Sequence, residues 1–320
     1  MRRAALMGAR RFDLKEVDVP TPGPTQALVK VAYNGVCGSE FPAYLGLCTG
    51  YPYYARRQEY PILSYGHEGV GSIVGTGPEV TDLKIGDRVV GSGGYAEYVV
   101  ADAGTLTKVP DGISEKHATL CKMAQEAAYV LELIRVTTAD RVLITGVGPA
   151  GLLILEHIRE VGCADIVCVD AIDHRLDVAA SLGATAVLKA GDKRVIEKIK
   201  AACGGGPTIA IDTSGVTQAI LTCYAAVANH GQMGLFGRPL NDIPSFRVED
   251  IVHRFLRIIG LKCPPIAYSR DRTLATLLRI KGSVLHADEI ITHEFPLERV
   301  GEAFEAAVSK AGLKIVVRCS

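Results

Sequence analysis

The glycine motif Gly-Val-Gly-Pro-Ala-Gly at residues 146–151 constrains the fold more than any other feature of this chain. It follows a short apolar stretch, Arg141 to Thr145, and opens a segment, Pro149 to Val161, with proline at the first turn, where helices accept it. A second apolar stretch, Asp165 to Asp170, precedes a helical pattern over Arg175 to Leu182. This alternation predicts a parallel sheet covered by helices on both faces. The further strands predicted for this sheet are Thr208 to Asp212, Gly231 to Phe236 and Arg257 to Lys262.

The segments on either side of this alternation have a different character. The first hundred residues are rich in Gly, Pro, Val and Tyr, and turn residues separate their short extended runs, which predicts a mostly β domain. The extended runs are residues 27–33, 69–75, 87–90 and 95–100. The last fifty residues are mixed in character, and we expect them to rejoin the first domain. We therefore predict an α/β chain, with a mostly β domain over residues 1–117, a Rossmann-type doubly wound sheet over 118–264, and a segment, 265–320, that completes the first domain.

Composition argues against several classes of partner. The 35 basic and 35 acidic residues give a formal net charge of zero, so nothing favours binding to nucleic acid or to an anionic membrane. No apolar run approaches the ~20 residues that a bilayer span requires. The apolar stretch near the start is too short for a signal peptide. The nine cysteines are irregularly spaced, which predicts a reducing compartment, the cytoplasm.

The glycine motif also predicts a ligand. Its glycines permit a tight turn, close approach of the backbone to a pyrophosphate and close helix packing, while the helix N-terminus offers N–H groups to the phosphates. Asp170, at the end of the next strand, is expected to bind both ribose hydroxyls and to repel a 2′-phosphate, which favours NAD over NADP. Alternatively, Asp170 caps the following helix, and Arg175 leaves some NADP use open. Gly237 is expected near the nicotinamide end. The predicted cofactor-binding residues are Gly146, Val147, Gly148, Pro149, Gly151, Asp170, Arg175 and Gly237.

A second group of chemistry-bearing residues precedes the nucleotide segment. Residues 37–40 (Cys-Gly-Ser-Glu) and 66–68 (Gly-His-Glu) supply a thiol, a hydroxyl, an imidazole and carboxylates. With these motifs the chain resembles the zinc-type medium-chain dehydrogenase/reductase family, specifically its polyol and threonine dehydrogenase branch. The matching motifs, in the expected order over nearly the whole chain, are Gly35-Val36-Cys37-Gly38-Ser39, Gly66-His67-Glu68-Gly69, Gly86-Asp87-Arg88-Val89, Gly93-Gly94-Tyr95-Ala96-Glu97-Tyr98, the glycine motif, and Ile291-Thr292-His293 with Phe295-Pro296-Leu297.

The resemblance implies a GroES-like catalytic domain in which Cys37 and His67 are ligands of a catalytic zinc. Thiolate and imidazole suit Zn²⁺, and a catalytic site keeps one position for the substrate oxygen, whose pKa the ion lowers. Glu68 is then an alternating or water-bridged ligand, and Ser39 carries the alcohol proton towards solvent. The alternatives are a buried thiol beside a satisfied histidine, and a serine that only caps a turn.

Two departures from the family bear on the metal. A third protein ligand lies just before the first helix of the nucleotide domain in this branch, and here Lys122 falls at that position, where an ammonium cannot bind a metal. Cys121 serves as the ligand if the register shifts by one, and Glu126 lies one helical turn further on. Alternatively the zinc is lost and Lys122 polarises the carbonyl directly. The second departure is Glu40, where the family usually has aspartate, which alters the support of the metal ligands.

These arguments define the predicted site. The four-cysteine lobe that binds a structural zinc in the family is absent from the sequence, so one catalytic ion and no structural zinc are expected. The predicted catalytic residues are Cys37, Ser39, His67 and Lys122, and the predicted metal ligands are Cys37, His67, Glu68 and Cys121.

The insert between Cys37 and His67 is rich in tyrosine and arginine. It is expected to line or cover the substrate, because hydroxyls, rings and guanidinium groups bind sugar-like, aromatic or anionic groups. The alternative is a solvated loop that packs on itself. The residues in question are Tyr44, Tyr51, Tyr53, Tyr54, Arg56, Arg57 and Tyr60.

The leading hypothesis for function is NAD-dependent oxidation of a secondary alcohol, such as a polyol, cyclitol, amino alcohol or biosynthetic intermediate. The alternatives are a metal-free quinone or enoyl reductase of the same fold, and a non-catalytic NAD-binding sensor. The strand at Arg257 to Lys262 is expected at a sheet edge, which needs to be covered. In the resembling family that edge pairs across a two-fold axis, which implies a homodimer or homotetramer.

Overall fold

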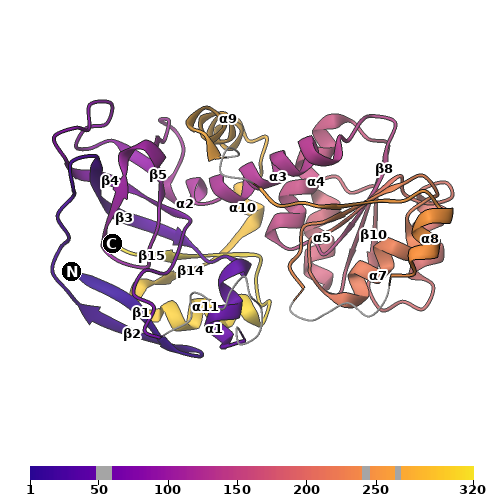
Figure 1. The fold of residues 1–320 in the computed structure, drawn as a ribbon, viewed down its shortest axis with the longest axis horizontal. Coiled ribbons are helices and arrows are strands. Elements are labelled where there is room, and N and C mark those ends of the chain that lie inside the picture. Colours follow the sequence, from indigo (N-terminus) through magenta and orange to yellow (C-terminus); the bar gives the residue numbers. More distant parts are fainter. Residues whose placement is uncertain (48–59, 240–245, 264–267) are drawn as a thin grey trace. The chain divides into compact units, whose positions relative to one another are not determined.

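The computed structural model describes residues 1–47, 60–239, 246–263 and 268–320, and contacts divide the chain into two units. Unit 1 comprises Met1–Lys122 and Tyr268–Ser320, and unit 2 comprises Met123–Ala267. The first and last segments of the chain therefore lie in the same unit (Figure 1). Whether the chain folds as domains that end at residues 117 and 264 stays a prediction.

Unit 1 is built on a mostly antiparallel seven-stranded sheet, in which six strands have the order β14-β15-β3-β4-β5-β7 and the seventh, β6, pairs with β3 beside this path. Among the described strands of this sheet, only β14 and β15 pair in parallel. Alternate residues of β3 are buried, as in a strand with one face towards a core. The C-terminal strand β15 pairs directly with β3, so it lies beside the strand that leads to Cys37. The strands are β1 (Arg2–Gly8) and β2 (Arg11–Glu16), which form a separate hairpin, with β3 (Gln26–Gly35), β4 (Gly69–Thr76), β5 (Arg88–Ser92), β6 (Tyr98–Asp102), β7 (Thr107–Lys108), β14 (Ile291–Pro296) and β15 (Lys314–Arg318).

Short helices complete unit 1. They are η1 (Gly38–Glu40), α1 (Phe41–Leu45), η3 (Ala103–Thr105), α2 (Glu115–Ala118), α9 (Arg270–Lys281), α10 (Ala287–Ile290), η5 (Leu297–Arg299) and α11 (Val300–Val308). The helix α3 (Cys121–Ile134) begins in this unit and continues in unit 2.

An aromatic cluster fills the core of unit 1. Phe304, from α11, lies at its centre, with ring centroids 4.8 Å from Tyr44 and 5.0 Å from Phe12. Tyr44 is 1% exposed and its hydroxyl donates to Glu305 Oε1 at 2.7 Å. The expectation that Tyr44 lines the substrate is therefore wrong, because its ring is used for packing. The hydroxyl of Tyr60 donates to the Ala43 carbonyl, and residues 51, 53, 54, 56 and 57 of the insert lie outside the described residues.

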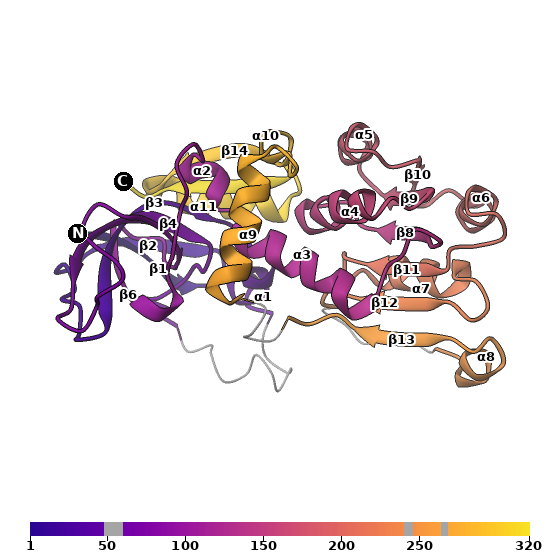
Figure 2. The same cartoon turned by 90° about the horizontal axis from the view of Figure 1, so that it is seen from above.

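Unit 2 is a six-stranded sheet with the order β10-β9-β8-β11-β12-β13, and every neighbouring pair is parallel. The order can be followed in Figure 2. Residues 142–145 and 166–170 are buried without alternation, as expected for strands covered on both faces. The elements are β8 (Arg141–Thr145), α4 (Pro149–Val161), β9 (Asp165–Asp170), α5 (Asp173–Ser181), β10 (Ala186–Lys189), α6 (Val195–Ala202), β11 (Ile209–Asp212), α7 (Thr217–Ala226), β12 (Gln232–Leu235), α8 (Val248–His253) and β13 (Arg257–Gly260).

The two units together confirm the predicted fold class, a doubly wound parallel sheet joined to a mostly β unit. The crossover in strand order, from β8 to β9 on one side and to β11 on the other, places the glycine motif at the carboxyl end of β8, where ligands bind in such sheets. In the part of the chain that the structure describes, no helix is both long and apolar enough to span a bilayer.

Candidate active site

Three of the predicted metal ligands meet in unit 1. One ligand atom from each of Cys37, His67 and Glu68 lies within 4.8 Å of the others. Cys37 follows β3 after one intervening residue, Val36, and His67 and Glu68 immediately precede β4. The antiparallel pairing of these strands, with Asn34 opposite Gly69, brings the two segments together. The pairing of the two strands therefore brings Cys37 close to His67 and Glu68, although they lie far apart in the sequence.

Glycine and asparagine fix the backbone around Glu68. Gly66 has φ +105°, and a Cβ at this position would overlap the side-chain nitrogen of Asn34. The other end of that buried amide, Asn34 Oδ1, accepts from the Glu68 backbone N–H at 2.9 Å. A Cβ at Gly35 would overlap Glu68 Oε2. Both glycines are therefore required for the Glu68 carboxylate to occupy this position.

Glu40 supports Cys37 and His67 from behind. It is 5% exposed, and its Oε2 accepts from the Cys37 N–H at 3.0 Å and from the Tyr95 hydroxyl at 2.9 Å. Its Oε1 lies 3.5 Å from His67 Nδ1. The longer side chain at this position therefore still reaches the imidazole, and it turns Nε2 towards the cluster.

Ser39 lies on the open side of the same cluster. Its hydroxyl donates to Cys37 Sγ at 3.2 Å and lies 3.5 Å from His67 Nε2. The hydroxyl thus contacts both of the groups that offer a soft or borderline ligand atom. A serine hydroxyl that only capped a turn would not make these two contacts.

The cluster stabilises positive charge. Burial lowers the pKa of His67, but hydrogen bonds to Cys37 and Glu40 and their negative charges outweigh it and raise the pKa to about 10. Burial raises the pKa of Glu68, but the charges of Lys314 and His67 more than offset this, so the pKa is lowered. A bound metal ion would take the place of the His67 proton, because a histidine ligand must be neutral.

Lys314 is a residue of this cluster that the sequence reasoning missed. Its ammonium forms an ion pair with Glu68 Oε2 and donates to the Val36 carbonyl at 3.0 Å. The pairing of Val316 with Gly35 places β15 beside the cluster. A lysine at the start of a strand that is otherwise buried and apolar is the signal that could have identified it.

The structure does not bring Cys121 into the cluster. Cys121 is 2% exposed, and its thiol donates to the Thr273 carbonyl at 3.6 Å. Burial raises the pKa of this thiol, which disfavours the thiolate that a metal needs. The neighbouring Lys122 has its ammonium 5.4 Å from the centre of the Tyr268 ring, and its charge contributes to the lowered pKa of Glu68.

The donor set fits a zinc ion. Cys37, His67 and Glu68 offer sulfur, nitrogen and oxygen, which are the three ligand types that zinc takes in proteins. Glu40 supports the histidine in the way that carboxylates support metal-bound imidazoles. Lys314 occupies Glu68 Oε2, so Oε1 is the oxygen left for an ion.

The glycine motif forms the predicted strand–turn–helix in unit 2. Gly146 has φ +84°, and a Cβ there would come within 2.7 Å of Ser214 Cβ. Gly148 is the N-cap of α4, Pro149 is its first residue, and no side chain of the described residues caps this end. A Cβ at Gly151 would overlap the Gly146 carbonyl. The loop is therefore compact and leaves the backbone N–H groups of the helix end to a ligand.

Asp170 holds this loop in place. Its Oδ2 accepts from the Val147 N–H at 2.8 Å, and its Oδ1 accepts from the Ile172 N–H at 3.0 Å. The carboxylate thus accepts from the Ile172 N–H, but no side chain of the described residues caps α5, so the helix-capping alternative is not what the structure shows; the contact with ribose stays a prediction. Arg175, on α5, has Nη1 3.4 Å from the position of a Cβ on Gly148, so its guanidinium lies beside the same loop.

Asp212 is a second residue that the sequence reasoning missed. Its Oδ1 accepts from the Ser214 hydroxyl at 2.7 Å and from Thr145 at 3.1 Å, and its Oδ2 accepts from the Gly215 N–H at 2.9 Å. A Cβ at Gly237 would overlap the Gly215 nitrogen. The position of Asp212 at the carboxyl end of a buried strand, before Thr-Ser-Gly, is the signal in the sequence.

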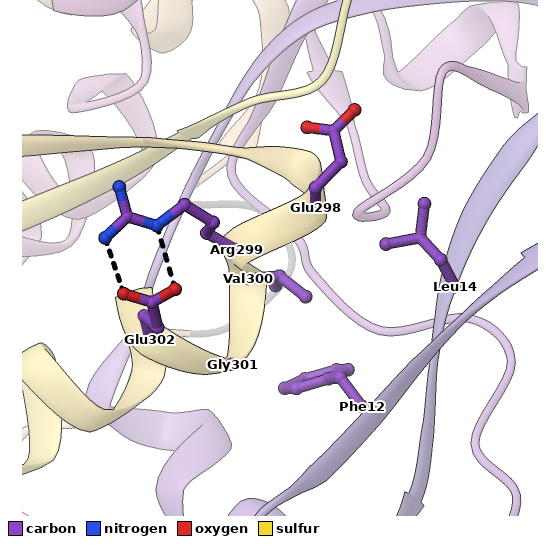
Figure 3. A pocket seen from close by; sticks show the side chains of 7 residues that line it. All are labelled: Phe12, Leu14, Glu298, Arg299, Val300, Gly301 and Glu302. Carbon is purple, nitrogen blue, oxygen red and sulfur yellow. Dashed lines mark hydrogen bonds and ion pairs between the residues drawn. The ribbon is translucent and has the colours of Figure 1, made fainter.

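A separate hollow of about 390 Å³ lies between β2 and the turn into α11 (Figure 3). Arg299 lies at its edge and forms two hydrogen bonds with Glu302. The residues that line it are Phe12, Leu14, Glu298, Arg299, Val300, Gly301 and Glu302. None of them belongs to the cluster of Cys37, so this hollow is not the site described above.

Comparisons with known proteins agree with this geometry. A model of the alcohol dehydrogenase GroES-like domain matches residues 23–111, and a model of zinc-binding dehydrogenases matches residues 149–277. The (R,R)-butanediol dehydrogenase of Bacillus subtilis is 27% identical over 99% of both chains, and a sorbitol dehydrogenase of Bombyx mori is 26% identical over 98% of this chain and 97% of its own. An L-threonine 3-dehydrogenase of Legionella pneumophila is 25% identical over 95% of each.

Solved structures give the same result. The crystal structure of the 2R,3R-butanediol dehydrogenase from Bacillus subtilis has a TM-score of 0.86 and 25% identity, and the match covers 100% of this chain and 99% of that one. Two family models that together span most of the chain in the expected order, full-length relatives and one shared fold agree. The chain therefore contains the alcohol dehydrogenase GroES-like domain and the zinc-binding dehydrogenase domain of the zinc-type medium-chain dehydrogenase/reductase family, and its relatives are polyol and threonine dehydrogenases, oxidoreductases that act on CH–OH donors.

Proposed function

We propose that this chain is an NAD-dependent dehydrogenase that interconverts a secondary alcohol and its ketone, with one catalytic zinc and no structural zinc. The observation that carries the proposal is the meeting of Cys37, His67 and Glu68, with the Ser39 hydroxyl against two of them. The relatives are named for butanediol, sorbitol and threonine, and each of these compounds has a secondary alcohol beside another polar group. The substrate class is accordingly a polyol, a cyclitol, an amino alcohol or a related biosynthetic intermediate.

The residues of unit 1 have distinct roles in this reaction. Cys37, His67 and Glu68 hold the zinc, which when bound supplies a Lewis acid for the alcohol oxygen. Ser39 Oγ receives the alcohol proton and passes it towards solvent, because its hydroxyl contacts two of the ligand atoms, Cys37 Sγ and His67 Nε2. Glu40 orients the imidazole.

Unit 2 supplies the hydride acceptor. The backbone N–H groups at the start of α4, with Gly146, Val147, Gly148, Pro149 and Gly151, bind the pyrophosphate of NAD. Asp170 accepts from the ribose through the lone pairs that its two backbone contacts leave free, and Arg175 lies beside the phosphates. Gly237 lies at the nicotinamide end, where any side chain would displace the Ser214–Gly215 turn.

The proposal includes self-association and a cytoplasmic location. Strand β13 is an edge of its sheet, and edge strands are usually covered. The preceding segment exposes three large apolar side chains, Val248, Val252 and Phe255, at 71%, 63% and 66%. A second copy that pairs with this edge gives a homodimer, or a homotetramer built from dimers. None of the cysteines in the described ranges forms a disulfide, in keeping with a reducing compartment.

One observation favours a second candidate function. Lys122 contributes positive charge to the cluster, which supports a metal-free quinone or enoyl reductase in which this ammonium polarises a carbonyl. The experiment that separates the two measures NADH formation and consumption with panels of polyols, amino alcohols, ketones and quinones. Zinc content is determined in protein purified without chelator. Alcohol oxidation that chelation abolishes and zinc restores supports the proposal; undiminished turnover in zinc-free protein contradicts it. Tight NAD binding without any turnover favours the sensor.

A further inference from the structure

Lys122 is rigidly placed at the beginning of α3. It is the last residue of unit 1 before the chain enters unit 2, and its neighbour Cys121 is buried and bonded to the Thr273 carbonyl. The Lys122 backbone is therefore fixed in the same unit as Cys37 and His67. The side chain is half-buried, and its charge reaches the carboxylate of Glu68.

Among the residues that the structure describes, none is an ionic partner of the Lys122 ammonium. No described residue forms a hydrogen bond or an ion pair with it, and its only close contact of this kind is the face of the Tyr268 ring at 5.4 Å. Glu68 does not serve as its counter-ion at short range, because Lys314 occupies that carboxylate. Nothing in the described part of unit 1 therefore uses the hydrogen-bonding capacity of this ammonium.

Helix stability does not explain a lysine here. A cation near the N-terminus of a helix opposes the helix dipole, and the first turn of α3 contains no acidic residue that would compensate. A lysine that opposes the helix dipole and has no ionic partner among the described residues, beside a candidate active site, indicates a role in binding.

A count of the charges in the site leaves one positive charge without a negative counterpart. With a divalent ion bound, the thiolate of Cys37 and the carboxylates of Glu40 and Glu68 supply three negative charges, which the ion and Lys314 balance. Lys122 then adds one positive charge that no described residue of the cluster compensates. An anionic group on the substrate would restore the balance.

We propose that Lys122 binds an anionic group of the substrate, a carboxylate or a phosphate close to the reacting carbinol carbon. This inference rests on the proposed function and narrows its substrate class to acidic alcohols, that is hydroxy acids or phosphorylated polyols. Lys122 is then a specificity-determining residue. The Tyr268 ring holds the stem and head of Lys122 while leaving its N–H groups to the ligand.

The first test compares matched alcohols that differ in charge. The carboxylate pair is 3-hydroxybutyrate with 2-butanol, and the phosphate pair is glycerol 3-phosphate with glycerol. We expect the protein to prefer the anionic member of one pair, which identifies the carboxylate or the phosphate as the source. In Lys122→Met this preference, as a ratio of kcat/KM values, falls about 10- to 100-fold, the loss expected for one hydrogen bond to a charged group.

Two variants control this test. Lys122→Arg keeps the charge and retains most of the preference. Lys116→Met removes a lysine of the same unit that lies 3.9 Å from Glu294 on the surface, and it leaves the ratio unchanged. A preference for the neutral alcohols, or a ratio that is the same with and without Lys122, overturns the inference while the proposed dehydrogenase activity stands.

The second test does not depend on turnover or on metal. In zinc-free protein, Cys37 is alkylated by iodoacetate, an anion, and by iodoacetamide, its neutral analogue, and the labelled peptide is quantified by mass spectrometry. We expect iodoacetate to be favoured in the native protein, and Lys122→Met to lower the ratio of the two rates about tenfold or more. Lys116→Met again leaves it unchanged. An equal ratio in the native protein and in Lys122→Met overturns the inference. A ratio that falls although no alcohol is oxidised supports an anion site and contradicts the proposed function.

Discussion

Lys314 Nζ and Glu68 Oε2 form an ion pair in which both side chains are almost completely buried, at 1% and 2% exposure. The pair joins β15, near the end of the chain, to the turn that carries His67 and Glu68. A buried ion pair stabilises little compared with apolar packing, yet removing one member leaves a charge in a medium that cannot solvate it. The pair therefore ties the integrity of the candidate metal site to the C-terminal strand.

We expect Lys314→Met to lower the free energy of unfolding of the metal-free protein by about 3–5 kcal/mol, because Glu68 then remains buried and unpaired. Urea denaturation measures this. The double variant Lys314→Met with Glu68→Gln is expected to recover part of the loss, since the unpaired charge is gone. An exposed pair provides the control: Arg299→Ala, which breaks the pair with Glu302, is expected to leave the unfolding free energy nearly unchanged, because solvent screens an exposed pair. Equal effects of the two single variants would contradict the argument.

Glu40 is expected to strengthen zinc binding through His67. Its carboxylate supports the imidazole and the Cys37 backbone, so Glu40→Gln should weaken zinc binding about 10- to 100-fold, the usual effect of losing such support. Competition with a chromogenic chelator measures the affinity.

Glu40→Asp separates geometry from charge. The shorter acid keeps the charge but cannot span the same distance between Cys37 and His67 without a shift, so its zinc affinity should lie between those of the native protein and Glu40→Gln. Glu302→Gln, at the surface, serves as the control and leaves zinc binding unchanged. If Glu40→Gln binds zinc as tightly as the native protein, the supporting role is refuted.

The fold of unit 2 follows closely from the sequence. The bounds of β8, α4 and β9 equal those that the sequence predicts, because uninterrupted apolar runs and a first-turn proline mark them clearly. The strand β10 is not predicted, since its apolar run, Ala186 to Leu188, is only three residues long, and none of its residues is fully buried. In unit 1, β6 begins at Tyr98 rather than at Tyr95. Gly94 has φ +121°, and Tyr95 turns inwards to Glu40, so this part of the apolar run is not extended in the sheet.

The candidate site is predictable only in part. Cys37, His67 and Glu68 lie in motifs, and the pairing of β3 with β4 brings them together. Lys314 lies 246 residues from Glu68, and only the pairing of β15 with β3 connects them, which no local pattern reveals. Cys121 is the reverse case. Its sequence position suits a ligand, but its thiol is directed to a backbone carbonyl.

Asp170 is expected to set the choice of cofactor. It fixes the Val147 N–H and lies at the carboxyl end of β9, so Asp170→Ala should weaken NAD binding about tenfold or more and leave NADP binding less affected. Tryptophan is absent from the chain, so fluorescence of bound NADH or NADPH gives the dissociation constants without interference from that residue. Asp173→Ala, three residues on in α5, is the control because its carboxylate pairs with Lys189 at the surface. Tighter binding of NADPH than of NADH by the native protein would refute this assignment.

Gly237 is expected to be required for cofactor binding for a steric reason. A Cβ at this position would overlap the nitrogen of Gly215, whose N–H donates to Asp212, so Gly237→Ala must displace the turn that Asp212 holds. We expect NADH affinity to fall at least about tenfold and the protein to lose about 1–3 kcal/mol of unfolding free energy, as overpacking in a tight site usually costs. Gly301→Ala is the matched control: a Cβ there meets no atom within 4 Å, and alanine within α11 should leave NADH binding unchanged and stability equal or higher. Titration with NADH and urea denaturation of both variants decide the matter. Should Gly237→Ala bind NADH as the native protein does, the turn at residues 213–215 is not part of the nicotinamide site.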